Sequence, residues 1–267
     1  ASSDGSAEMV AREFPDVRLT LNSSNLGFAA ACNTALRKAS GRCVVLLNPD
    51  TVVAPGVLTE LVNFLDARPG AGYCGPRLLN RDGSHQPSAF RFPTIFSPVL
   101  PLLGWGDRFP SSRHNSDLHL CHGNRQDFQA DRVCGACLMV KAEVIRQVGL
   151  LDEGYFMYFE ETDWCKRMAR AGWEGWYVAA AEVIHLGGQS MIGEREAGLF
   201  HGYPPRQWIQ SYRRYARRHH GVLGWLVSKA IQIAAYALIW LRNTWPFPDR
   251  TPNKARNAAS AIRHLLT

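Results

Sequence analysis

The feature that most constrains the fold of this chain is an alternation of strand-like and helix-like segments in its first 80 residues. Residues 43–47 form a continuous apolar run, which is typical of a strand buried on both faces. Helical periodicity precedes this run at 28–39, and an apolar helical stripe from Leu58 to Leu65 follows it. A second strand is indicated at 73–79. The alternation predicts an α/β fold, with a mostly parallel sheet flanked by helices.

The same periodicities predict further elements. We expect helices at 6–14, 142–148 and 162–171, and strands at 17–21, 133–141, 173–178 and 182–186. The stretch 80–132 holds five prolines and many polar residues, so we expect an irregular insert there. Residues 1–200 are therefore predicted to form one domain, and residues 201–267 a helical tail.

The tail carries the net positive charge of the chain. The whole chain has 30 Lys and Arg against 23 Asp and Glu, but residues 201–267 contain eleven basic groups and a single acid. A basic aromatic helix is predicted at 209–220. Such a segment favours either nucleic acid or an anionic membrane surface as partner. We expect the membrane and no nucleic acid, because an apolar twenty-residue segment follows directly.

That apolar segment, 222–241, is interrupted only by Ser228, Lys229 and Gln232. Its length is sufficient to span a bilayer. A central Lys and polar residues at helical spacing favour instead a helix that lies in the membrane interface. A surface helix packed on the body of the protein is the third alternative. The tail is therefore expected to be a helical appendage that associates with the membrane.

The cysteines do not indicate a disulfide framework. Seven of them, an odd number, are scattered through a long chain, which predicts reduced thiols in the cytoplasm. Cys134 and Cys137 have the Cys-x-x-Cys spacing of zinc and redox sites, but no second pair or histidine set follows at ligand spacing. We expect both to pack in the core. The hydrophobic content of 46% excludes a disordered chain.

Two polar residues follow the buried strand at 43–47. Asn48 and Asp50 flank Pro49 and lie on the same side of an extended chain. In open α/β sheets, ligands bind beyond the carboxyl ends of the strands. An amide oxygen and a carboxylate suit Mg²⁺ or Mn²⁺ on a diphosphate. The alternative is an Asx-turn that caps the next helix.

Three acids, Glu160, Glu161 and Asp163, follow an aromatic run at the start of a predicted helix. Acids at a helix N-terminus interact favourably with the helix dipole, so some of them are candidates for structural caps. Aromatic neighbours lower the local dielectric constant, and acids this close raise each other's pKa. A carboxylate whose pKa lies near neutrality is what a general base requires.

Two further signals are weaker. His185 stands at a strand end beside two glycines, where it could reach a phosphate or a metal that approaches the backbone. A histidine satisfied in the surface or the core is the alternative. Asn25 and Gly27 open the predicted helix at 28–39, and helix N-termini attract anions.

The order of these motifs resembles that of a known family. The series runs Ala1-Ser-Ser-Asp4-Gly5-Ser6, Asn25-Leu-Gly27-Phe-Ala-Ala, Leu47-Asn-Pro-Asp-Thr51, Gly135-Ala-Cys-Leu-Met139, Tyr158-Phe-Glu-Glu-Thr-Asp-Trp164 and His185-Leu-Gly-Gly-Gln-Ser190. Over about residues 1–190 the chain resembles a family-two bacterial glycosyltransferase of the GT-A fold, and the rhamnosyltransferase-like members in particular.

The resemblance implies an inverting transfer of a sugar, with rhamnose a candidate, from a nucleotide-diphosphate donor. The implied acceptor is a glycan or lipid-linked glycan in cell-envelope polysaccharide synthesis. Asn48-Pro49-Asp50 matches the metal-binding Asp-x-Asp position, which implies that Asp50 binds Mg²⁺ or Mn²⁺. His185 matches a position that contacts the metal or the diphosphate in some relatives. Asn25, Gly27 and Asn48 are implied to lie on the side of the nucleotide donor.

The resemblance also implies the catalytic residues. Glu161 falls where the family usually has the Asp that acts as catalytic base, and Glu160 lies beside it. Asp163, one helical step on, is expected to orient the acceptor or the base. The implied chemistry agrees with the reading of the residues themselves: a metal stabilises the leaving diphosphate while a carboxylate deprotonates the attacking hydroxyl.

Members of this family begin with a strand, a helix and a second strand ahead of the segment at Ala1, a βαβ start of about 30 residues. We therefore expect this chain to be either a fragment, truncated at its N-terminus, or a catalytically incomplete relative that acts as a membrane-associated binding module. The insert 80–132 and the tail are expected on the acceptor side. The expected location is the cytoplasm, at the inner face of the cell membrane.

Overall fold

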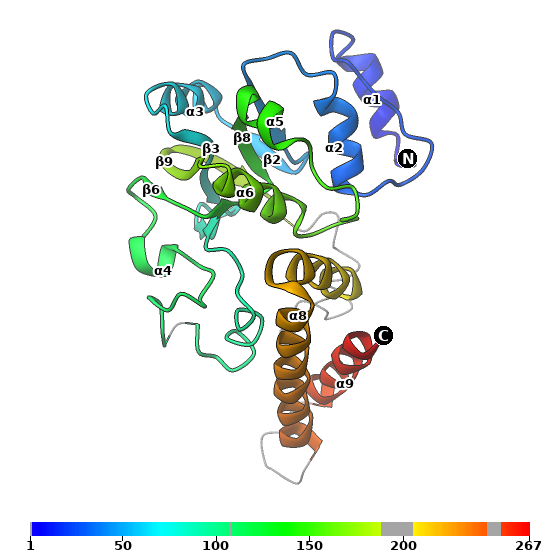
Figure 1. Ribbon diagram of the computed structural model, residues 1–267. Coiled ribbons are helices and arrows are strands. Elements are labelled where there is room, and N and C mark those ends of the chain that lie inside the picture. The colour runs from blue at the N-terminus through cyan, green and yellow to red at the C-terminus, as the bar shows by residue number, and fades with distance from the viewer. Residues whose placement is uncertain (1, 107, 188–204, 245–251) are drawn as a thin grey trace.

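The central sheet has the strand order β1-β8-β3-β9-β2 and carries helices on both faces (Figure 1). The structure, a computed structural model, describes residues 2–106, 108–187, 205–244 and 252–267. The strands of this order are β1 (Cys43–Leu47), β2 (Thr51–Val53), β3 (Ala71–Leu79), β8 (Cys137–Lys141) and β9 (Glu174–His185). The predicted α/β class is confirmed.

The sheet is mixed, which corrects the expectation of a mostly parallel one. Strands β1, β3 and β9 run in the same direction, and β3 and β9 are parallel neighbours. Strand β8 lies antiparallel between β1 and β3, and β2 pairs antiparallel with β9. Neither reversed strand follows a helical crossover, because β2 comes after a short turn and β8 after the insert. Parallel neighbours require such a crossover, so these two strands were free to reverse.

Two apolar layers hold the helices to the sheet. The helices are α2 (Phe28–Leu36), α3 (Val57–Asp66), α5 (Ala142–Val148) and α6 (Glu160–Arg170). Helix α3 packs on one face, against Cys74 and Met139. Helices α2, α5 and α6 cover the other face, where Tyr73 and Leu138 point. Adjacent residues of β3 and β8 thus serve opposite layers, as the two-residue repeat of a strand dictates.

The remaining body elements are short. They are α1 (Ser6–Glu13), β4 (His85–Gln86), β5 (Ala89–Phe90), α4 (His119–His122), β6 (Phe128–Gln129) and β7 (Arg132–Val133). The strand expected at 17–21 is wrong: the segment is not extended into a sheet, and Val17 and Leu21 are exposed. The two strands expected at 173–178 and 182–186 are one strand, β9, whose pairing with β3 shifts register between Pro76 and Arg77.

The C-terminal part consists of two helices that extend away from the sheet (Figure 1). They are α8 (Arg206–Thr244) and α9 (Pro252–Leu266). Gly221 interrupts α8 with φ 75° and ψ 176°, a conformation that favours glycine. Tyr212, Tyr215, Trp225 and Tyr236 of α8 form an apolar cluster with α9 and with the loop before α6. The tail therefore packs directly on the body through its first half.

The second half of α8 buries two polar residues beside Trp225 and Tyr236 and exposes several leucines. Ser228 and Gln232 are fully buried, and Ser228 Oγ lies 2.8 Å from the hydroxyl of Tyr212. In contrast, Leu223 and Leu238 are 74% and 62% exposed. Among the described residues, α8 is the one helix whose length and composition would allow it to cross a membrane.

Candidate active site

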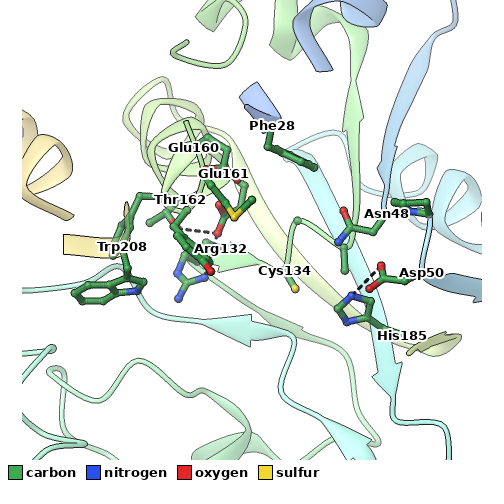
Figure 2. Close-up of a pocket in the computed structure, with 16 residues that line it drawn as sticks. Phe28, Asn48, Asp50, Arg132, Cys134, Glu160, Glu161, Thr162, His185 and Trp208 are labelled. Carbon is green, nitrogen blue, oxygen red and sulfur yellow. Dashed lines mark hydrogen bonds and ion pairs between the residues drawn. The ribbon is translucent and has the colours of Figure 1, made fainter. Parts of the chain in front are cut away.

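Asp50 and His185 meet at one end of a cavity of about 450 Å³ (Figure 2). The antiparallel pairing of β2 and β9 places Thr51 opposite His185, and the amide of Leu186 donates to the carbonyl of Asp50 at 2.8 Å. Asp50 Oδ1 is consequently 3.4 Å from His185 Nε2. Two residues that are 135 positions apart in the sequence thus form one polar corner.

Asn48 lines the same cavity and shapes the turn between β1 and β2. Its backbone N–H donates to the carbonyl of Ala136 at 2.9 Å, and its backbone carbonyl accepts a hydrogen bond from the Thr51 hydroxyl at 2.7 Å. The alternative of an Asx-turn that caps the next helix does not apply, because strand β2 lies between this segment and α3. Asn48 and Asp50 point toward a shared space at the carboxyl end of β1, as the sequence predicted.

Glu160 and Glu161 lie on the opposite side of the cavity, with Cys134 between the two sides in Figure 2. They begin helix α6 directly after Tyr158 and Phe159, whose φ angles are 69° and 68°. A left-handed conformation at a residue other than glycine costs on the order of 1 kcal/mol or more. This sharp turn starts the helix with its two glutamates facing the cavity.

The two glutamates differ in their surroundings. Glu161 Oε1 accepts the Thr162 hydroxyl at 2.9 Å and is 3.5 Å from Arg132 Nη1. Glu160 is 6% exposed, and its Oε2 has no hydrogen-bond partner among the described residues. Burial raises the pKa of Glu160 to about 8, and the charge of Glu161 adds to this shift. At neutral pH Glu160 thus keeps its proton, and Arg132 lies where it can stabilise a negative charge on Glu161.

Asp163 does not line the cavity. Its side chain has no exposed surface, and its two oxygens are 2.8 Å from His219 Nε2 and 2.9 Å from Arg167 Nε. Burial favours a higher pKa, but the hydrogen bonds from His219 and Arg167 outweigh it and hold the pKa of Asp163 below its usual value. The predicted catalytic role does not fit this position: Asp163 connects α6 to α8 instead.

Asn25 and Gly27 also lie outside the cavity. Asn25 Oδ1 accepts the amide of Gly27 at 3.1 Å, and a side chain at Gly27 would meet the carbonyl oxygen of Phe156 at 2.3 Å. Gly27 is therefore needed for close packing of α2 against the loop before α6. Their neighbour Phe28 does line the cavity. Donor binding by Asn25 and Gly27 stays a prediction, and Gly188, Gln189 and Ser190 of the last motif lie outside the described residues.

The two cysteines of the Cys-x-x-Cys motif lie in different places, one in the core and one at the cavity. Cys137 is buried in the sheet, as expected, whereas Cys134 lines the cavity. Burial raises the pKa of both thiols, so neither is a thiolate at neutral pH. In the described part of the chain, no group of three or more Cys, His, Asp and Glu side chains gathers at a possible metal position.

Sequence reasoning missed three residues that line the cavity: Phe28, Arg132 and Trp208. Arg132 comes from β7 at the end of the insert, and Trp208 from the first turn of α8. Trp208 stacks on Tyr212 with ring centroids 5.3 Å apart and meets Phe159 edge-on at 5.2 Å. No local pattern marks Arg132 and Trp208, because only the packing of the insert and the tail brings them to the cavity, whereas Phe28 belongs to the motif that opens α2.

The polar corner fits a divalent ion completed by a substrate. Asp50 offers a carboxylate oxygen and His185 an imidazole nitrogen, and two adjacent ligands of an octahedral ion stand about 3 Å apart. The protein would thus supply two ligands, Asp50 and His185, and the substrate diphosphate and water would supply the others. Mg²⁺ commonly binds in this way, with one or two protein ligands and substrate phosphates.

A mixed sheet with an acidic corner beyond β1 and a glutamate pair at the start of α6 defines a GT-A type glycosyltransferase domain. The model of the family described as glycosyl transferase family 2 matches residues 1–147, so the chain belongs to that family. The chain is a glycosyltransferase with rhamnosyltransferase relatives.

Three similar proteins illustrate this assignment. The chain is 26% identical over 257 residues to an N-acetylglucosaminyl-diphospho-decaprenol L-rhamnosyltransferase of Mycobacterium tuberculosis, covering 89% of this chain and 80% of that one. It is 22% identical to the dTDP-rhamnosyl transferase RfbF of Shigella flexneri over 66% of this chain and 54% of that one. The solved structure of GalNAc-T7 with UDP, GalNAc and Mn²⁺ matches 99% of this chain and 47% of its own, with a TM-score of 0.54 and 12% identity, which shows a shared fold.

Proposed function

We propose that this protein transfers a sugar, with inversion, from a nucleotide-diphosphate donor to a hydroxyl of a glycan or lipid-linked glycan acceptor. One observation supports the proposal: the polar corner of Asp50 and His185 and the base candidate Glu161 line the same cavity. A single displacement at the anomeric carbon needs a positive charge beside the leaving diphosphate and a base beside the attacking hydroxyl.

The residues divide the chemistry between them. Glu161 accepts the proton of the acceptor hydroxyl as its oxygen attacks the anomeric carbon, and the nucleoside diphosphate departs from the opposite face. Glu160, protonated at neutral pH, adds no competing negative charge beside the base. Asp50 and His185 would hold Mg²⁺ or Mn²⁺, which when bound neutralises charge on the leaving diphosphate.

The relatives suggest the substrates. One relative is named as a dTDP-rhamnosyl transferase, and another as a rhamnosyltransferase acting on N-acetylglucosaminyl-diphospho-decaprenol. We infer dTDP-rhamnose as donor and an N-acetylglucosaminyl-diphospho-lipid as acceptor. Trp208 at the cavity supports a sugar acceptor, because an aromatic ring offers an apolar face to a pyranose.

The transfer test uses dTDP-rhamnose, an N-acetylglucosaminyl-diphospho-prenol and Mn²⁺ or Mg²⁺, with mass spectrometry and NMR of the product. The expected product is the rhamnosylated lipid, with the anomeric configuration opposite to that of the donor. Transfer with retained configuration would contradict the single-displacement mechanism. Absence of transfer from dTDP-rhamnose and from UDP-sugars alike would contradict the proposed activity.

We also propose that α8 associates with the cytoplasmic face of the cell membrane. The outward side of its second half is apolar, with Leu223 and Leu238 largely exposed. Arg213 and Arg217 of its first half are exposed, and no ion pair to either is present in the described part of the chain. A helix with cationic and apolar exposed surfaces suits an anionic lipid interface. This location would bring the cavity close to a lipid-linked acceptor.

A further inference from the structure

His185 has a hydrogen-bond partner that no motif contains. Gln86, in strand β4 of the insert, lies with its Oε1 2.8 Å from His185 Nδ1. Strands β4 and β9 both pair with the end of β3, at Leu78 and Leu79, which brings the two side chains together. The Nδ1 side of the ring therefore faces the insert, and the Nε2 side faces Asp50 in the cavity.

Gln86 is the last member of a series of hydrogen bonds that we call the hairpin chain. Its members are Asp82, Ser84, Asn80 and Gln86. The Ser84 hydroxyl lies 2.6 Å from Asp82 Oδ1, Asn80 Nδ2 lies 2.9 Å from Ser84 Oγ, and Gln86 Nε2 lies 3.3 Å from Asn80 Oδ1. The series thus leads from an exposed carboxylate to the edge of the cavity.

The direction of every bond in the hairpin chain follows from its first member. An ionised carboxylate only accepts, so the Ser84 hydroxyl must donate to Asp82, and its oxygen is left to accept from Asn80 Nδ2. The same orientation of Asn80 directs Nδ2 toward the carbonyl of His85 at 3.5 Å. Asn80 Oδ1 then accepts from Gln86 Nε2. Gln86 must consequently present its oxygen to His185.

An amide oxygen cannot donate, so His185 Nδ1 must carry the hydrogen of this bond. In a neutral imidazole the other nitrogen, Nε2, then has a free lone pair. Nε2 lies 3.4 Å from Asp50 Oδ1, so a divalent ion bound by Asp50 would be within reach of this lone pair. A metal-ligating histidine needs this arrangement, since its second ring nitrogen usually donates to a carbonyl or carboxylate that fixes the tautomer.

We propose that Gln86 is a positioning residue that holds His185 as the Nδ1–H tautomer and presents Nε2 to a divalent ion shared with Asp50. This inference rests on the proposed function, because it assumes that the ion binds at the polar corner. It assigns a role to the insert as well: β4 and the turn before it orient a ligand on β9.

The test measures Mn²⁺ binding in the presence of dTDP, by the loss of the free Mn²⁺ signal in electron paramagnetic resonance. Gln86→Leu removes the acceptor at similar volume and should weaken Mn²⁺ binding about 10- to 100-fold. Gln86→Glu keeps an acceptor oxygen and should bind Mn²⁺ as the unchanged protein does. Gln147→Leu is a matched control, because Gln147 also accepts a ring N–H, from Trp173 at 2.7 Å, on the surface away from the cavity.

A second readout reports the tautomer itself. In ¹⁵N spectra of the metal-free protein at pH 8, we expect His185 Nδ1 to be protonated and Nε2 to be bare. Wild-type Mn²⁺ affinity in Gln86→Leu, at an unchanged melting temperature, would overturn the inference, and so would an Nε2–H tautomer in the unchanged protein. If the unchanged protein itself binds no Mn²⁺ with dTDP, the proposed metal site fails and the inference falls with it.

Discussion

Glu160 and Glu161 are neighbours in the chain but have different environments at the cavity. Glu161 has Arg132 and the Thr162 hydroxyl to stabilise its charge, whereas Glu160 is buried with one oxygen unpaired. Two carboxylates this close cannot both ionise without large repulsion. The less solvated one, Glu160, keeps the proton, which supports the proposal that Glu161 is the base. The titration of Glu160 then makes the free energy of unfolding depend on pH.

Replacement of Glu160 by Gln should stabilise the fold at alkaline pH. The folded protein releases the Glu160 proton near pH 8, whereas the unfolded chain releases it near the ordinary value of 4.5. The contribution of Glu160 to the free energy of unfolding therefore falls as the pH rises from about 5 to 8. Glu160→Gln removes this loss, and we expect a gain on the order of 2 kcal/mol at pH 8 but little change at pH 5. Urea unfolding of both proteins at the two pH values measures the difference. An equal effect at both would contradict the assigned protonation.

These site residues show how far local sequence could be used for prediction. Asp50 and Glu161, which both line the cavity, could be proposed from the sequence because each follows a strong local signal, a buried strand in one case and an aromatic run at a helix start in the other. Asp163 was misplaced because helical position alone does not say which neighbour a side chain meets. Its partner His219 is 56 residues away and on a different element. Gln86 and Arg132 lie in the insert, where no periodicity indicated their contacts.

At the scale of elements, the contact between α6 and α8 joins the helix that carries Glu160 and Glu161 to the tail. Asp163 is the buried centre of this contact, with Arg167 on its own helix and His219 on α8. The Ser211 hydroxyl of α8 also donates to the carbonyl of Met157 at 2.7 Å. The turn that directs Glu160 and Glu161 into the cavity is thus supported from the tail side.

Loss of the Asp163 charge should destabilise the protein strongly. Asp163→Asn leaves the cationic Arg167 buried without its anion, and removal of one partner from a buried pair typically costs about 3–5 kcal/mol. Asp152 is the matched control, because it also accepts from two arginines, but these are about half exposed. Asp152→Asn should cost about 1 kcal/mol or less. Urea unfolding compares the two variants, and equal losses would show that Asp163 is not a buried anchor.

The exposed apolar side of α8 predicts membrane binding. We expect the protein to float with vesicles containing anionic lipid, and the double variant Leu223→Glu, Leu238→Glu to remain in solution. Leu58→Glu is the control, because Leu58 is also exposed but lies on α3 of the sheet domain. Arg213→Ala should weaken binding about fivefold at low salt, since each basic residue near an anionic surface contributes about 1 kcal/mol. Flotation of the double variant equal to that of the unchanged protein would exclude α8 as the membrane contact.

At the scale of the whole molecule, the sequence predicted the classes of elements better than their pairing. Strand β1 and helix α5 were predicted with the bounds observed, because the apolar run of β1 and the closing glycine of α5 mark them locally. The direction of β8 and the union of two predicted strands into β9 depend on contacts between segments far apart in the chain. The burial of Ser228 in α8 has the same origin. Ser228 became a buried residue once Tyr212 and the carbonyl of Ile95 supplied its hydrogen bonds.

We propose that two functions lie on opposite sides of one cavity: Asp50 binds the metal and the donor, and Glu161 removes the proton of the acceptor. Calorimetry of dTDP binding with Mn²⁺, paired with the transfer assay, tests both functions on two variants. Asp50→Asn should lose Mn²⁺-dependent dTDP binding together with transfer. Glu161→Gln should bind Mn²⁺ and dTDP as the unchanged protein does while transfer falls at least 100-fold, the usual range for loss of a general base. Transfer at the unchanged rate by Glu161→Gln, or unchanged Mn²⁺-dependent dTDP binding by Asp50→Asn, would contradict the account.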